Sequence, residues 1–452
     1  MADAEKALFG EQWQQGAAAL TPRAPPPPPG PAHAALDRAS LRDATRRRDH
    51  GVDHHFSCML DRWEVANQRQ TGRCWIYAAM NVLKTSAVKN FKSFQLSPNY
   101  LAFYDKLEKA NTFLQLVRQT AELPIDARIV QHLLATTAED GGQWNMVVGL
   151  VEKYGVVPQW CMQRCQSEDG TRELNGVLER LLRQAAHEVR SALARQQPAE
   201  AAIRSALGKV RTVLVTHYGP PPERFRMRWR DDDQEEHDMG ELTPLGFSEK
   251  LWRRPPAEYV VLVHDPRPRS PLYQRYIVNG LTSCVEKSSF AYINVPIEDM
   301  KACVAQSLQE LKEPVWFACD VGQEHDSKRG LLVHQLYDTW SAYGFTQPSL
   351  DKAQRLEYGG SLPTHAMTFT GLDEQNGKIV KWRVENSWGD EGGDDNKSEG
   401  KGFLAMDDSW FDEYVYEVAV PRSLVPAETL SRAEQRETTA LPLWDPMGSV
   451  AR

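Results

Sequence analysis

The stretch that decides the fold is NQRQTGRCW, residues 67–75. After it, apolar residues recur at helical spacing without a proline as far as Phe91, so we expect a buried helix that begins at Cys74. The preceding residues form a loop, with Thr71 or Gly72 at the helix entry. A thiolate is favoured at a helix N-terminus and by a neighbouring imidazolium. Cys74 is therefore a candidate nucleophile.

A second reading of Cys74 is that it is a small buried hydrophobic residue, as most unpaired cysteines are. Gln68, six positions earlier, favours the first reading, because its side-chain amide can fold back beside the sulfur. Together with the backbone N–H of Cys74, this amide would form an oxyanion hole for a tetrahedral intermediate.

Two later motifs accompany these residues in the same chain order. Thr364-His365-Ala366-Met367 opens an expected strand, and Glu385-Asn386-Ser387-Trp388-Gly389 ends the next one. With the Gln68–Cys74 spacing, these motifs resemble the active-site motifs of the papain-like cysteine peptidases.

The resemblance implies a role for each of these side chains. His365 would take the proton from Cys74 and later give one to the leaving amine. Asn386 would orient the imidazole, and the indole of Trp388 would shield their hydrogen bond from water. A lone histidine among apolar residues is more often part of the core, but the company of the other motifs favours catalysis.

Asp140-Gly141-Gly142 precedes a second expected helix, from Trp144 to Tyr154, which Gly155 ends. In papain-like enzymes two glycines before a helix let the substrate backbone approach the main chain, so Gly141 and Gly142 are candidate substrate-binding residues. The alternative is a plain Gly-Gly turn.

The separation of Cys74 and His365 is 291 positions, whereas about 130 to 150 is usual for the papain group. Roughly 150 residues are therefore inserted, mostly between 160 and 310, and they include two long helical stretches within 171–217 that break around Gln197-Pro198. This enlarged frame resembles the bleomycin hydrolase family, from about His55 to the C-terminus. The most similar stretches are residues 67–75, 140–157, 265–268, 316–322, 382–389 and 443–448.

We therefore predict an α+β chain with a papain-like two-part fold, a helical half and an antiparallel β-barrel half, and a large, mainly helical insertion. Further strands are expected at 259–263, 315–319, 366–371, 378–385, 402–406 and 414–420. The expected parts are a disordered Pro-rich extension (1–50), the helical half (51–160), the insertion or hook (161–310), the β half (311–435) and a C-terminal arm in the active-site cleft (436–452).

The resemblance also implies a cytosolic, homohexameric aminopeptidase that is able to deamidate bleomycin and carries its own C-terminus in the cleft. The free carboxylate of Arg452, or of Ala451 after trimming, would pair with the α-ammonium of a peptide and limit cleavage to the first bond. A frayed terminus is the usual alternative. The apolar side chains of Leu441, Leu443, Trp444 and Met447 favour a docked arm.

The composition of the chain narrows the possible binding partners and the cellular compartment. A formal net charge of -8 and a pI near 5.9 make nucleic acid a poor partner. Seven cysteines without regular spacing suit a reducing compartment, and no secretory leader or 18-residue apolar run is present in the sequence, so we expect a cytoplasmic protein without membrane contact.

Neither a metal nor a cofactor is expected. The acidic loop 390–400 does not match the twelve-residue calcium pattern, and the basic run 46–48 is interpreted as a solvated surface. Two rival functions remain. One is an endopeptidase with an open cleft, and the other is a ring-shaped nucleic-acid-binding or scaffold protein in which catalysis is secondary.

Overall fold

The computed structural model describes residues 31–48, 53–60, 65–86, 95–162, 165–231, 235–287, 289–347, 350–389 and 402–449, and these form two compact units. The smaller unit combines 31–48 with 337–347. It holds α3 (Pro31–Leu36) and α4 (Leu41–Thr45), and the N–H of Asp338 donates to the Thr45 carbonyl at 2.8 Å. Residues 31–45 of the extension, which was expected to be disordered, thus hold two short helices, and Ser40 caps α4. The proline run 25–29 lies outside the described residues.

The larger unit carries all the other described α-helices and β-strands. Its helices are α5 (Cys74–Ser86), α6 (Pro98–Gln119), α7 (Arg128–Ala135), α8 (Trp144–Tyr154), α9 (Gln166–Asp169), α10 (Arg172–Ala194), α11 (Glu200–Tyr218), α12 (Pro244–Leu251), α13 (Ile297–Gln306), α14 (Lys352–Glu357), α15 (Asp408–Tyr414) and α16 (Ala427–Glu434). Its strands are β1 (Cys58–Met59), β2 (Phe225–Arg230), β3 (Glu236–Leu242), β4 (Tyr259–Val263), β5 (Gln274–Val278), β6 (Ala291–Asn294), β7 (Val315–Cys319), β8 (His325–Asp326), β9 (Leu331–Leu332), β10 (His365–Gln375), β11 (Lys378–Glu385), β12 (Phe403–Asp407), β13 (Val415–Pro421) and β14 (Thr439–Leu441).

The elements expected from local sequence patterns are confirmed, except that residues 87–91, the end of the first expected helix, lie outside the described residues. Helix α5 begins at Cys74, α8 spans Trp144 to Tyr154 with Gly155 at positive φ as its cap, and α10 and α11 break where expected. All six expected strands are present, with three of them at the expected bounds. Among the described residues, no helix is both long enough and apolar enough to cross a membrane.

The main sheet corrects the expectation of an antiparallel barrel. It has twelve strands, in the order β14-β5-β6-β4-β13-β7-β10-β11-β12-β9-β8 with β1 on β10. Three of its pairs are parallel, namely β4 with β6, β5 with β14 and β9 with β12, so the sheet is mixed. Strands β4 to β6 come from the region that was expected to be mainly helical. Strand β4 was expected there, but β5 and β6 were not. The pairing of β14 with β5 joins segments that are far apart in the sequence, so no local pattern predicts it.

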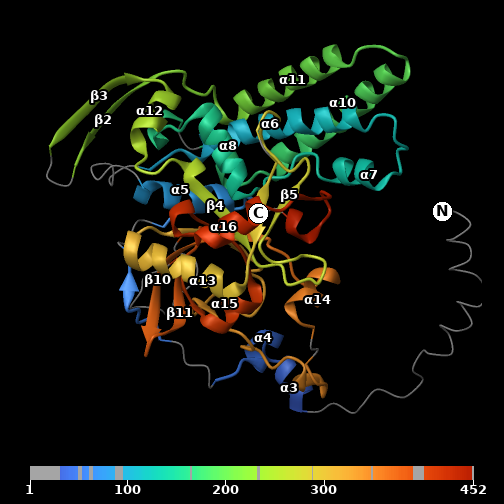
Figure 1. The fold of residues 1–452 in the computed structure, drawn as a ribbon. Coiled ribbons are helices and arrows are strands. Elements are labelled where there is room, and N and C mark those ends of the chain that lie inside the picture. The colour runs from blue at the N-terminus through green and yellow to red at the C-terminus, as the bar shows by residue number, and fades with distance from the viewer. Residues whose placement is uncertain are drawn as a thin grey trace, which may run out of the picture. The chain divides into compact units, whose positions relative to one another are not determined.

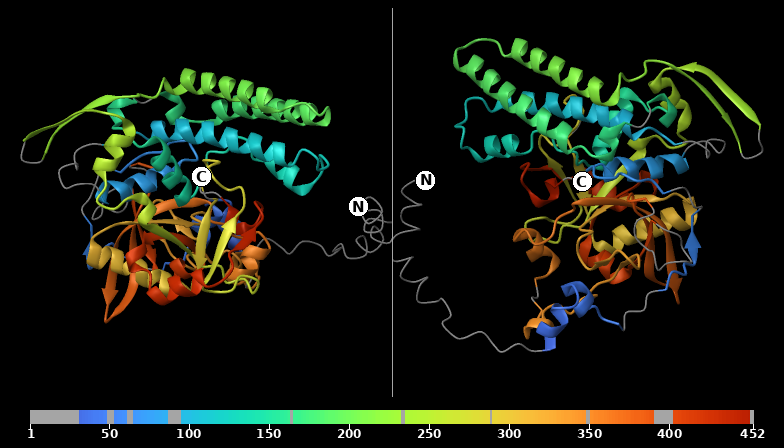
Figure 2. Two further views of the ribbon diagram at one scale, coloured as in Figure 1. Left: turned by 45° about the horizontal axis from the view of Figure 1, so that its top comes forward. Right: turned by 180° about the vertical axis from the view of Figure 1, so that it is seen from behind.

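Helix α5 lies where the helical and β parts of the larger unit meet. It packs against α6 and α8 on one side and against β7 and β10 on the other. Figures 1 and 2 show α6, α10 and α11 side by side beyond α5, with β10 and β11 on its other side. Side chains alternate along β7. Trp316 and Ala318 pack with α5 and the helices, whereas Phe317 and Cys319 join a second core on the opposite face.

Candidate active site

Cys74 is the first residue of α5, and its side chain is fully buried. Its Sγ accepts a hydrogen bond from the backbone N–H of Ala366 at 3.4 Å, 292 positions along the chain. Ala366 follows His365, the first residue of β10. The fold therefore brings the candidate nucleophile to the strand end that carries the candidate base.

The pKa of the Cys74 thiol differs from the expected direction. Burial raises its pKa to about 12, although hydrogen bonds from the N–H groups of Ala366 and Trp75 and its own N–H act in the opposite direction. A helix N-terminus was expected to lower this pKa. Desolvation of a completely buried sulfur outweighs that effect, so the thiol is neutral in this arrangement and needs a proton acceptor before it can react.

The imidazole of His365 is held by Asn386. Nε2 of His365 lies 2.9 Å from Oδ1 of Asn386, and the Asn386 oxygen also accepts from the N–H of Ser387 at 2.8 Å. An amide oxygen only accepts, so Nε2 is the protonated nitrogen and donates. The ring of Trp388 lies 4.9 Å from that of His365, tilted by 39°, and both members of the hydrogen bond are buried. The indole thus contacts the imidazole, as expected.

Gln68 is fixed between two segments of the site. Its Nε2 donates to the Thr71 carbonyl at 2.6 Å, and its Oε1 accepts from the hydroxyl of Ser387 at 2.5 Å. Its backbone N–H donates to the Ser387 carbonyl at 2.7 Å. Ser387 therefore ties the Gln68 loop to the Asn386 motif, a role that sequence reasoning missed because the serine lies 319 positions away.

The two glycines lie against the residue that follows the nucleophile. A Cβ on Gly142 would come within 2.5 Å of the Trp75 ring, so this position admits only glycine without rearrangement. Nε1 of Trp75 donates to the carbonyl of Asp140 at 2.8 Å. The carbonyl of Gly141 accepts from Nζ of Lys109 at 2.6 Å. The Gly-Gly segment therefore has a packing role beside Cys74 in addition to any role in binding.

Asp140 supplies a buried anchor that the sequence pattern did not single out. Its carboxylate contacts Nζ of Lys106 at 2.6 Å, accepts from the N–H of Gly72 at 3.1 Å and accepts from the hydroxyl of Thr171. Burial opposes ionisation, but the charges of Lys106 and Arg73 outweigh it and hold the pKa of Asp140 well below its usual range. The carboxylate joins the loop before Cys74 to α6 and α10.

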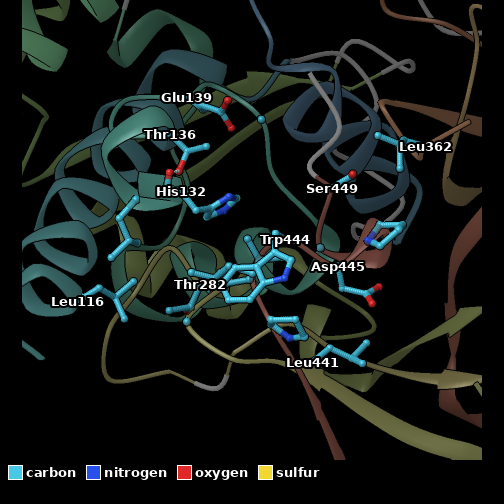
Figure 3. Close-up of a pocket in the computed structure, with 18 of the residues that line it drawn as sticks. Leu116, His132, Thr136, Glu139, Thr282, Leu362, Leu441, Trp444, Asp445 and Ser449 are labelled. Atoms are coloured by element: carbon cyan, nitrogen blue, oxygen red, sulfur yellow. Dashed lines mark hydrogen bonds between the residues drawn. The ribbon is translucent and has the colours of Figure 1, made fainter. Parts of the chain in front are cut away.

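A cavity of about 760 Å³ adjoins this site. Gly141 and Thr364, the residue before His365, contribute to its wall, and residues 441–446 with 448 and 449 form another part of it. The C-terminal arm therefore lines the same cavity as Gly141. Figure 3 shows Trp444 of the arm near His132 and Thr282, with Asp445 and Ser449 further along.

The arm is docked at several points, as its apolar residues predicted. Met447 is buried in the core, and the guanidinium of Arg128 stacks 4.7 Å from the Trp444 ring. Strand β14 pairs with β5. The side-chain amide of Gln143, directly after Gly142, donates to the Ser449 carbonyl. Ala451 and Arg452, like the loop 390–400, lie outside the described residues.

Comparison with known proteins shows the family to which this chain belongs. The model of the Peptidase C1-like family matches residues 31–448. Bleomycin hydrolase of Homo sapiens is 38% identical over 436 residues, 93% of this chain and 93% of the relative. Aminopeptidase C of Streptococcus thermophilus is 38% identical over 413 residues, 90% of this chain and 91% of the relative.

A solved structure agrees with these relatives. The crystal structure of PepW from Lactobacillus rhamnosis superposes with a TM-score of 0.87 at 36% identity and covers 98% of both chains. The overlap spans both the helices and the mixed sheet around Cys74. The chain therefore belongs to the Peptidase C1-like family of papain-like cysteine peptidases.

Proposed function

We propose that this chain is a thiol aminopeptidase that releases N-terminal residues from peptides through a thioester acyl-enzyme. The observation that carries the proposal is the hydrogen bond from the N–H of Ala366 to Sγ of Cys74, next to a His365 ring that Asn386 fixes. Nδ1 of His365 is the unprotonated nitrogen when Nε2 donates to Asn386, so it is the atom that can accept a proton from the thiol.

In the reaction, Cys74 transfers its proton to His365 as Sγ forms a bond to the scissile carbonyl carbon. The C–N bond then breaks, and the imidazolium gives its proton to the leaving amine. Water next attacks the thioester carbonyl carbon and gives a proton to His365. The C–S bond then breaks, the carboxylic acid departs, and His365 returns the proton to Sγ, which restores the thiol of Cys74. Because burial holds the pKa of Cys74 near 12, the imidazolium formed by proton transfer has to stabilise the thiolate.

The negative oxygen of the tetrahedral intermediate is assigned to Gln68 and the backbone N–H of Cys74. One N–H of the Gln68 amide is used by the Thr71 carbonyl, and its oxygen by Ser387, which fixes the direction of the second N–H. A donor oriented in advance loses little entropy when the charge develops. Gly141 and Gly142 are assigned to the substrate backbone, and Trp388 to shielding of His365.

Specificity for a free N-terminus is assigned to the C-terminal arm. Relatives of this chain are named aminopeptidase C and bleomycin hydrolase, and the arm of this chain lines the cavity beside Gly141. A terminal carboxylate on Arg452, or on Ala451 after trimming, would bind the α-ammonium and leave no room for longer segments. By the same resemblance we propose a cytoplasmic homohexamer able to deamidate bleomycin, with the parts 51–160, 161–310, 311–435 and 436–452 as expected above.

The test is hydrolysis of an aminoacyl-coumarylamide by the purified protein, beside the same compound with an acetylated amine. Release of coumarin from the free-amine substrate alone supports the proposal, and Cys74→Ala should abolish it. Cys58→Ala is the matched control, because this half-buried thiol lies on β1 away from the site. Equal turnover of both substrates would indicate an open-cleft endopeptidase, and activity retained by Cys74→Ala would exclude the nucleophile.

A further inference from the structure

One face of α5 forms a row of polar contacts with the two strands that carry His365 and Asn386. Cys74, Ala78 and Asn81 are spaced at i, i+4 and i+7, so they lie on the same face of the helix. The Sγ of Cys74 accepts from the N–H of Ala366 at 3.4 Å. The carbonyl of Ala78 accepts from the hydroxyl of Thr368 at 3.3 Å on β10.

The third contact of this row joins α5 to β11. Nδ2 of Asn81 donates to Oε1 of Glu385 at 3.0 Å, across 304 positions of the chain. Glu385 is the last residue of β11, immediately before Asn386, and pairs with Thr368 in the sheet. The row therefore has one contact at the start of β10, beside His365, and one at the end of β11, beside Asn386. Glu385 directly precedes Asn386, the residue that orients the imidazole.

Glu385 is a costly residue to bury. Its side chain is 1% exposed, and its Oε2 has no hydrogen-bond partner within the described part of the chain. Burial raises its pKa to about 7, although the charges of Lys84 on α5 and Arg383 on β11 favour the ionised form. An apolar residue of similar size would avoid this cost, so the carboxyl needs a reason that packing alone does not supply.

We propose that Glu385 is a positioning residue, which through its hydrogen bond to Asn81 sets α5 against the end of β11 and so fixes Cys74 relative to His365 and Asn386. The physical argument is that this hydrogen bond fixes the position of α5 relative to the end of β11. The backbone contacts of β10 hold the sulfur to Ala366, but Asn386 sits on the neighbouring strand just past its last sheet pair. The Asn81–Glu385 bond is a side-chain contact that spans from the nucleophile helix to that strand end.

This inference rests on the proposed function, since it concerns the alignment of the same catalytic groups. When reacting groups are misplaced by a fraction of an ångström to 1 Å, the rate of the chemical step falls far more than the affinity for the substrate. A change at Glu385 should therefore act on kcat and leave KM nearly unchanged. It should also slow alkylation of Cys74 by iodoacetamide, because that reaction needs the same proton transfer to His365.

The experiment compares Glu385→Leu, Glu385→Gln, Asn81→Leu and the double variant Glu385→Leu/Asn81→Leu in the full-length protein. We expect Glu385→Leu and Asn81→Leu each to lower kcat about 10- to 100-fold, with KM within about twofold. Glu385→Gln keeps an oxygen that can accept from Asn81, so it should restore kcat to within about threefold of the wild type. The double variant should be no slower than either single variant, because both remove the same contact.

Glu417→Gln is the matched control, because it changes an equally buried carboxyl on β13, three places from β11 in the sheet. It should leave kcat and the alkylation rate within about twofold of the wild type. A kcat for Glu385→Leu equal to the wild type, in a wild-type enzyme that is active, would overturn this inference and leave the proposed function intact. So would equal losses in Glu385→Gln and Glu385→Leu, or additive losses in the double variant. An inactive wild type would instead contradict the proposed function.

Discussion

The buried guanidinium of Arg267 binds the carboxylate of Asp445 through hydrogen bonds of 2.8 and 3.3 Å, across 178 positions of the chain. A second carboxylate, Asp265, holds the same guanidinium in place at 2.7 and 2.8 Å. The Asp445 carboxylate also accepts from the N–H of Met447 at 2.9 Å. A preorganised cation in the body of the protein thus binds the arm four residues before its last described residue, Ser449.

Removal of this contact should change which peptides are cleaved. Asp445→Asn weakens a buried, charge-assisted pair and should destabilise the protein by roughly 2 kcal/mol. With residues beyond 445 less well held, the KM for substrates with a free amine should rise and acetylated peptides should become substrates. Steady-state kinetics on matched free and acetylated peptides, with urea unfolding, measures both effects.

Arg269→Ala is the control for the arm. Its guanidinium is largely exposed and lies 3.6 Å from Asp445, so its loss should cost well under about 1 kcal/mol and leave acetylated peptides uncut. If Asp445→Asn loses stability but still rejects acetylated peptides, the arm does not exclude them through this contact.

The oxyanion assignment predicts a loss confined to the chemical step. Gln68→Ala removes an amide whose direction is set by Thr71 and Ser387, and kcat should fall about 10²- to 10³-fold with little change in KM. Gln309→Ala removes a side chain whose Nε2 donates to Glu374 at 2.8 Å in an exposed hydrogen bond, and it should leave kcat unchanged. A Gln68→Ala enzyme with raised KM and normal kcat would assign Gln68 to binding.

The local patterns of this sequence predicted much of the fold around the site. Helix α5 and strands β7 and β11 were predicted with their first residues correct, because periodicity and flanking turn residues act over a few positions. The pairing of β4, β5, β6 and β14 was not predicted. Strand β14 pairs with β5 across more than a hundred positions, whereas β4, β5 and β6 lie close together in the sequence, and in both cases nothing in a short strand specifies its partner.

The same limit applies to the site. The motif spacing predicted Cys74, His365 and Asn386 as a set, since each motif is compact in sequence, and the fold brings the three residues together. It did not identify Asp140 or Ser387 as anchors, because their roles depend on contacts with distant residues. It also gave the wrong direction for the pKa of Cys74. The helix terminus is visible in the sequence, but the complete burial that outweighs it exists only in the folded protein.

Two glycines give opposite predictions for one substitution. Gly142→Ala would place a Cβ 2.5 Å from the Trp75 ring, so we expect a loss of about 1–3 kcal/mol and reduced activity beside Cys74. Gly208→Ala on α11 meets open space and should stabilise the protein by about 0.5–1 kcal/mol with no effect on activity. Urea unfolding of both variants measures the difference. A tolerated Gly142→Ala would mean that Trp75 can move, and the close approach would then not define the site.

The raised pKa of Glu385 predicts a pH dependence of stability. Its folded pKa of about 7 lies above the ordinary glutamate value of 4.5, so between these values the folded protein binds more protons than the unfolded chain. The contribution of this group is therefore complete below pH 4.5 and is lost as pH rises through 7. The shift corresponds to roughly 3 kcal/mol.

Glu385→Gln removes this titration, so the unfolding free energy of the wild type minus that of the variant should fall by roughly 3 kcal/mol between pH 4.5 and 8. His264 titrates in the opposite sense, because burial lowers its folded pKa to about 4, but it is present in both proteins and cancels in the difference. Urea unfolding at half-unit steps of pH measures the two curves. If their difference is constant with pH, the carboxyl of Glu385 has the same pKa in the folded protein and in the unfolded chain, and burial does not raise it.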